Sequence, residues 1–66
     1  MTITINGSEK SFESPLTIET LLEKLGLAKN PVVVELNKEA IFPREYAAIQ
    51  LKQSDSLEII TIAAGG

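Results

Sequence analysis

The sequence predicts a two-layer α+β domain in which a single helix packs on one face of a small β-sheet. Three observations support this prediction. Residues 2–6 alternate between polar and apolar side chains, which is the period-two pattern of a half-buried strand. Residues 18–25 repeat apolar side chains at helical spacing. Residues 57–62 form an apolar segment near the end of the chain, which indicates a closing strand.

The first half of the chain contains a hairpin and the helix. Asn6-Gly7 favours a tight turn because both residues tolerate a positive φ, and a return strand is expected over about residues 10–13. Thr17 is the expected N-cap of the helix, and Gly26 is the expected left-handed residue that ends it. Between them, one face of the helix carries an apolar stripe made of Ile18, Leu21, Leu22 and Leu25.

The second half of the chain adds three extended segments. Residues 32–36 are rich in β-branched side chains and predict a strand, and a short extended segment follows at 40–42. Pro43 is expected to open a brief helical turn. A turn at 54–56 then leads into the closing strand at 57–62. This order is that of the β-grasp fold, with four to five strands in a mixed sheet and the first and last strands side by side at its centre.

Length and composition indicate one domain, residues 1–66, with residues 62–66 as a flexible C-terminal Gly-Gly tail. The net charge is −3, and the six Lys and Arg residues are scattered, so nucleic-acid binding is not expected. No apolar run approaches the length of a membrane span, and the N-terminus lacks the features of a secretory signal. We therefore expect a cytoplasmic protein with neither a membrane nor a nucleic acid as its partner.

The side chains of this sequence are poorly suited to catalysis. There is no Cys and no His, which removes a disulfide framework, the usual metal ligands and the general base of neutral pH. Glu19, Glu23 and Glu35 are interpreted as solvated charges, because a domain this small has little room for a cavity that would change their acidity. We expect no metal site, no catalytic residue and no enzymatic activity of the chain itself.

The C-terminal residues are the strongest candidate for chemistry. The last four residues are Ala63, Ala64, Gly65 and Gly66. An α-carboxylate is ionised at neutral pH and can attack the α-phosphate of ATP to form an acyl-adenylate. Glycine allows the backbone to approach the walls of a nucleotide pocket closely. We therefore expect other enzymes to activate the carboxylate of Gly66.

The whole chain resembles the sulfur carrier proteins of thiamine biosynthesis, a ubiquitin-like β-grasp family. The resemblance begins at the Asn6-Gly7 turn and the helical leucines. It continues through Val34-Glu35-Leu36-Asn37, Ile41-Phe42-Pro43-Arg44, Asp55-Ser56-Leu57-Glu58-Ile59 and Ala63-Ala64-Gly65-Gly66.

This resemblance implies a defined set of partners. An adenylating enzyme related to ubiquitin-activating enzymes would use ATP and magnesium to adenylate Gly66. A sulfur donor, for example of the cysteine desulfurase type, would convert the adenylate to a thiocarboxylate, and thiazole synthase would accept the sulfur. The chain itself would hold no cofactor stably, and we expect it to be a monomer when free.

Alternation along the closing strand predicts a docking surface. If Leu57 and Ile59 face the helix, then Glu58, Ile60 and Ile62 point to the opposite face of the sheet. A two-layer fold provides nothing to cover that face, so Ile60 and Ile62, together with Val33 across the sheet, are expected to form an exposed apolar patch that docks the adenylating enzyme. The alternative is that these are ordinary scattered surface side chains.

Three further residues near Pro43 have two interpretations each. Arg44 is a candidate partner contact, and its alternative is a local ion pair with Glu45 or Glu39. Phe42 and Tyr46 are interpreted as satellite core residues rather than binding aromatics, because the chain has few large apolar side chains.

Other functions remain open at this point. The small sulfur-carrying subunit of molybdopterin synthase shares the fold and the Gly-Gly end, but it is usually longer and has a bulkier apolar segment before its tail. A protein modifier conjugated to lysines would form isopeptide bonds instead of a thiocarboxylate. A β-grasp interaction module would function equally well without Gly66.

Overall fold

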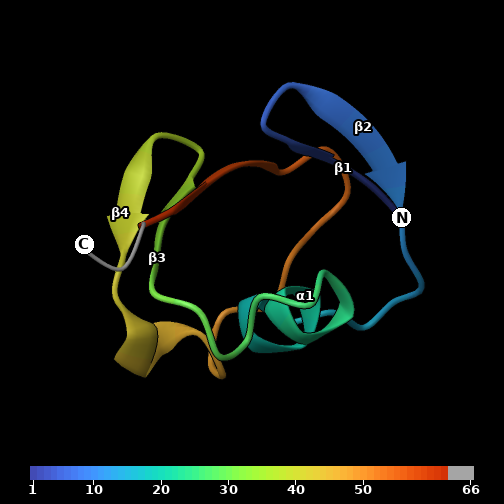
Figure 1. The fold of residues 1–66 in the computed structure, drawn as a ribbon. Helices are drawn as coiled ribbons and strands as arrows, with labels where there is room; N and C mark the ends of the chain where they lie inside the picture. Colours follow the sequence, from blue (N-terminus) through green and yellow to red (C-terminus); the bar gives the residue numbers. More distant parts are fainter. Residues whose placement is uncertain (63–66) are drawn as a thin grey trace.

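The computed structural model describes residues 1–62 as a five-stranded mixed sheet with one helix on one face (Figure 1). The strand order is β2-β1-β5-β3-β4, with β5 parallel to β1 and antiparallel to β3. This arrangement confirms the predicted β-grasp topology and the central pairing of the first and last strands. The elements are β1 (Thr2–Ile5), β2 (Ser8–Ser11), α1 (Ile18–Lys24), β3 (Val32–Leu36), β4 (Glu39–Ile41), the 3-10 helix η1 (Pro43–Glu45) and β5 (Ser56–Thr61).

The first hairpin turns on two residues. Asn6 has φ 50° and Gly7 has φ 84°, as predicted for this pair. The register places Ile5 opposite Ser8, so β2 starts directly after the turn. The prediction placed the return strand at residues 10–13, but the strand starts at Ser8, because a two-residue turn leaves no loop before it.

Helix α1 is capped as the sequence predicts. Thr17 is extended (φ −96°, ψ 166°), and its hydroxyl accepts a hydrogen bond from the N–H of Thr20 at 3.1 Å. The N–H of Ile18 donates to the carbonyl of Ile49 at 3.2 Å, so the segment after η1 satisfies another free donor of the first turn. At the other end, Gly26 adopts φ 75°, which confirms its expected left-handed conformation.

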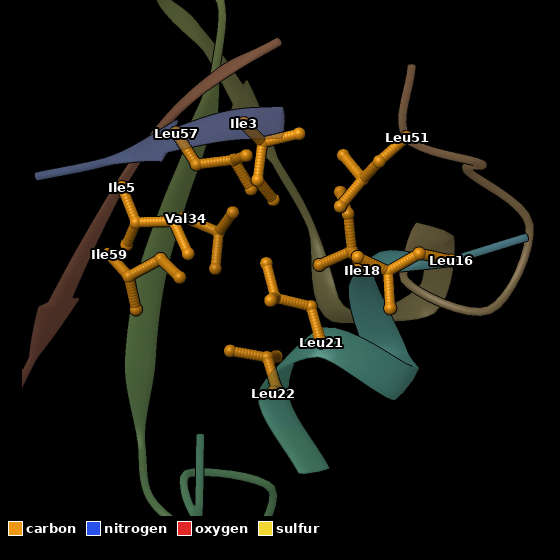
Figure 2. Close-up of a cluster of buried hydrophobic side chains, with 10 residues drawn as sticks. All are labelled: Ile3, Ile5, Leu16, Ile18, Leu21, Leu22, Val34, Leu51, Leu57 and Ile59. Atoms are coloured by element: carbon orange, nitrogen blue, oxygen red, sulfur yellow. The ribbon is translucent and has the colours of Figure 1, made fainter. Parts of the chain in front are cut away.

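The core lies between α1 and the inner face of the sheet (Figure 2). Side chains of β1, β3 and β5 point toward the helix, and the segments flanking the helix close one end of the cluster. Because one helix face meets one sheet face, the opposite sheet face has no covering layer among residues 1–62. The buried cluster consists of Ile3, Ile5, Leu16, Ile18, Leu21, Leu22, Val34, Leu51, Leu57 and Ile59.

Phe42 does not belong to the core, so its interpretation as a satellite core residue was wrong. Ile41 packs against the core, and the backbone at Phe42 stays extended (φ −91°, ψ 151°). Alternation along extended backbone therefore turns the ring of Phe42 away from the helix, and the residue is 53% exposed. Tyr46, in contrast, packs against the core as predicted.

A buried carboxylate fixes the start of β5. Asp55 is 6% exposed and accepts hydrogen bonds from the side-chain amide of Asn37 at 3.1 Å and from the N–H of Lys52 at 2.7 Å. Asn37 in turn accepts from the N–H of Ser56 at 3.0 Å. Asp55 thereby joins the β3–β4 turn to the turn before β5.

Replacing Asp55 with alanine should lower the free energy of unfolding by about 2–3 kcal/mol, because the substitution leaves two donors without their charged acceptor. Urea unfolding followed by circular dichroism measures this change. Glu13→Ala is the matched control, since Glu13 is exposed and the change should stay within about 0.5 kcal/mol. Equal stabilities of the two variants would contradict an anchoring role for Asp55.

Candidate functional site

The open face of the sheet carries four exposed apolar side chains near the end of β5. Val33 on β3 lies directly opposite Ile60 on β5, and Phe42 follows β4 on the other side of Val33. Ile62 lies two residues beyond Ile60. Their exposed fractions are 42% for Val33, 58% for Ile60, 53% for Phe42 and 50% for Ile62. We call these four residues the apolar row.

Burial along β5 confirms the predicted division between its two faces. Leu57 and Ile59 are 0% and 5% exposed, whereas Glu58 and Ile60 are exposed. The predicted residues Val33, Ile60 and Ile62 therefore share one face with Glu58. An exposed apolar surface of this kind on a small domain is typical of a contact site for another protein.

A pair of carboxylates lies next to the apolar row on the same face. Glu35 of β3 is directly opposite Glu58 of β5, one alternation step from the opposed pair Val33 and Ile60. Along a strand, two residues span about 6.6–6.8 Å. Glu58 was among the predicted contact residues. Glu35 was not, because its cross-strand partner can be known only from the register of β3 and β5.

Arg44 lies over the ring of Phe42, a member of the apolar row. Its guanidinium carbon lies 5.0 Å from the centroid of the Phe42 ring, within the range of a cation–π interaction. The carboxylate of Glu45 accepts a hydrogen bond from the N–H of Phe42 at 2.8 Å, which fixes the entry to η1. The structure thus places the predicted contact residue Arg44 at the β4 end of the row.

Asn6 holds β5 in place beyond the end of β1. Its side-chain amide donates to the carbonyl of Ile59 at 3.0 Å, and its side-chain oxygen accepts from the N–H of Ile59 at 2.8 Å. The side chain of Asn6 thus makes the two hydrogen bonds to β5 that the main chain of one more β1 residue would otherwise make. The Asn-Gly pattern indicated the turn but gave no sign of this second role.

The predicted reactive residues follow the row directly. The N–H of Ile62, which was expected to begin the flexible tail, donates to the carbonyl of Pro31 at 2.9 Å. Ala63, Ala64, Gly65 and Gly66 lie outside the described residues. Covalent geometry limits four residues to a span of about 14 Å. Any enzyme that reacts with Gly66 must therefore approach the domain close to Ile62.

The helix side of the domain offers a small pocket instead of a reactive centre. The pocket has a volume of about 240 Å³, and Glu19, Leu22, Leu27 and Tyr46 are among its lining residues. Within residues 1–62, the hydroxyl of Tyr46 is buried without a hydrogen-bond partner, and burial raises the pKa of this phenol. Across residues 1–62, we find no cluster of three His, Cys, Asp or Glu side chains suited to a metal ion. In the same part of the chain, no helix has the length and hydropathy needed to cross a bilayer.

Comparison with known proteins identifies the family. The model of the ThiS family matches residues 2–66. This chain belongs to the ThiS family. The resemblance inferred from the hairpin, the strand segments and the Gly-Gly end is therefore confirmed.

Individual relatives of this ThiS-family chain differ in length. The sulfur carrier protein ThiS of Bacillus subtilis is 33% identical over 63 residues, which cover 94% of this chain and 96% of that protein. A thiazole synthase of Paramagnetospirillum magneticum is 38% identical over the whole of this chain, which spans only 20% of that relative.

A solved relative has the same fold. The crystal structure of the thiamine biosynthesis protein ThiS from Geobacter metallireducens is 30% identical, with a TM-score of 0.84 over 100% of both chains. This agreement supports the five-stranded β-grasp arrangement.

Proposed function

We propose that this ThiS-family chain is a sulfur carrier protein of thiamine biosynthesis, with the carboxylate of Gly66 as the carrier group. The observation that supports this most directly is the sequence Ala63-Ala64-Gly65-Gly66, which follows the last strand of a ThiS fold by a single residue. The full-length similarity to the B. subtilis sulfur carrier protein also supports it.

The proposed chemistry takes place at one carboxylate. The carboxylate oxygen of Gly66 attacks the α-phosphate of ATP, releases pyrophosphate and forms an acyl-adenylate. Hydrosulfide then attacks the acyl carbon and releases AMP, which leaves a thiocarboxylate. ATP and magnesium belong to the adenylating enzyme. Where a donor such as a cysteine desulfurase supplies the sulfur as a persulfide, the same attack gives an acyl disulfide, and a thiol reduces this disulfide to release the thiocarboxylate. This chain acts as a protein substrate of those cytoplasmic enzymes and contributes no catalytic side chain.

Thiazole synthase is the proposed acceptor of the sulfur. A thiazole synthase from P. magneticum contains a segment 38% identical to this chain within a protein about five times as long. Joining the two activities in one polypeptide is a natural arrangement if the carrier delivers its sulfur to that enzyme. When the sulfur passes from the thiocarboxylate to the growing ring, an oxygen from water or from the acceptor takes its place on the acyl carbon, and the Gly66 carboxylate is ready for another cycle.

The apolar row is the proposed docking surface for the adenylating enzyme. Gly66 can reach no farther than about 14 Å from Ile62, so an enzyme that adenylates it must contact the surface around that residue. Ile60 and Val33 are the central apolar side chains there, and their exposure leaves them free for contact. Arg44, stacked over Phe42, would lie at the margin of this contact.

One experiment tests the carrier function directly. The purified chain is incubated with a thiamine-type adenylating enzyme, ATP, magnesium and sulfide, and its intact mass is measured with C-terminal fragmentation. We expect one oxygen of Gly66 to be replaced by sulfur. Fragmentation is required because oxidation of Met1 gives nominally the same mass change. A folded chain that forms neither adenylate nor thiocarboxylate with a competent enzyme would support a β-grasp interaction module instead.

A further inference from the structure

Two negative charges face each other at the centre of the open sheet face. Glu35 and Glu58 are directly opposed on the neighbouring strands β3 and β5. Like charges in this position destabilise a sheet, where a β-branched or oppositely charged pair would stabilise it. Among residues 1–62, neither carboxylate takes part in a side-chain hydrogen bond. The free chain therefore carries an unfavourable pair next to its apolar row.

The position of this pair relates it to the proposed docking surface. Val33 and Ile60 are two residues away on the same two strands and the same face, about 6.6–6.8 Å along the sheet. An interface of ordinary size buries about 800 Å² on each partner, which is far more than four side chains provide. A protein that covers the apolar row must therefore also cover Glu35 and Glu58.

Burying two carboxylates without a partner would strongly oppose docking. A surface that pairs them with a positive charge removes this cost. Arginine suits the site best, because its planar guanidinium presents five donors and can bond to two carboxylates at once.

We propose that Glu35 and Glu58 form an acidic recognition site for a basic side chain, best an arginine, on the enzyme that adenylates Gly66. This inference rests on the proposed carrier function. It adds that the docking enzyme presents an apolar surface with a basic residue at one side, positioned over β3 and β5. Apolar contact supplies the affinity. The charge pairing fixes how the chain is oriented on the enzyme, and this orientation directs the tail into the active site.

The test uses a double variant with a matched control. Glu35→Gln with Glu58→Gln removes both charges from the open face, whereas Glu19→Gln with Glu23→Gln removes two exposed charges from α1 on the opposite layer. Adenylation is measured by ATP–pyrophosphate exchange at increasing chain concentration, at low and high salt. Thermal unfolding of each variant reports on folding.

We expect the open-face double variant to raise the KM for the chain by about 10- to 100-fold at low salt, with kcat largely unchanged. The KM should also lose most of its dependence on salt, while thermal stability should be unchanged or higher because the repulsion is removed. The α1 variant should stay within about twofold of the wild type, as expected for charges outside the contact.

Three outcomes would count against the proposal. Equal KM values and equal salt dependence for the two double variants would overturn the recognition site while leaving the carrier function intact. Unchanged adenylation with weakened binding to thiazole synthase would show that a different partner uses the two carboxylates. A wild-type chain that is not adenylated at all would overturn the carrier function itself, so the two failures are distinguishable.

Discussion

A chain shortened by one residue, so that it ends at Gly65, should be adenylated at least about 100-fold more slowly than the chain that ends at Gly66. The shortened chain still has a terminal carboxylate and a terminal glycine. That carboxylate lies up to about 3.5 Å short of its former reach, because one residue has been removed from the span. Displacements of about 1 Å at a reacting centre can reduce rates by about two orders of magnitude. ATP–pyrophosphate exchange and intact mass measure the loss.

Two controls separate this effect from unfolding and from weaker docking. The buried cluster lies between Ile3 and Ile59, so thermal unfolding of the shortened chain should match that of the wild type. A full-length chain with a Gly66 carboxamide keeps the length but lacks the ionised oxygen, and it should bind the adenylating enzyme without reacting. An unchanged adenylation rate for the chain ending at Gly65 would show that the position of the carboxylate does not decide the reaction.

The sequence predicts most of this fold because its local signals agree with its tertiary structure. Asn6-Gly7 can form a hairpin turn without any distant contact, and Thr17 caps a helix whose apolar stripe already indicates the buried side. Alternation along β5 also separates the buried Leu57 from the exposed Ile60 without knowledge of its neighbours. In these cases the periodicity of the element is sufficient.

The features that the sequence did not predict depend on pairing between distant residues. Phe42 has a large apolar side chain typical of a core residue. It is nevertheless exposed, because the extended backbone after Ile41 turns this side chain outward. The opposition of Glu35 and Glu58 follows from a register between strands more than 20 residues apart in the chain. Asn6 likewise bonds to Ile59 across 53 positions, which no local pattern reveals.

The candidate site shows the same division. Gly66 can be proposed as the carrier residue from the sequence alone, because the proposed chemistry needs only a carboxylate and small neighbouring residues. The proposed docking surface requires three strands in register, with Val33 opposite Ile60 and Phe42 beside them. The apolar row therefore becomes complete only in the folded sheet.

Replacing Ile60 with glutamate should raise the KM for the chain in adenylation by about 100-fold or more, with little effect on stability. Ile60 is 58% exposed and central in the apolar row, and side chains at the centre of an interface contribute most to binding. A glutamate there would lose the apolar contact and bury a third negative charge beside Glu35 and Glu58. The change in free energy of unfolding should stay within about 1 kcal/mol, because the substitution is at a solvent-facing position.

Two companion variants show which part of this effect comes from the apolar contact. Ile60→Ala removes only the side-chain area and should raise the KM by about 10-fold. Ser11→Glu adds the same charge to an exposed position on the edge strand β2, far from the row, and should leave the KM within about twofold. If Ile60→Glu leaves adenylation kinetics unchanged in a folded protein, the apolar row is not the docking surface. If Ile60→Ala alone has the full effect, apolar contact at this one side chain dominates docking, and charge affects only its register.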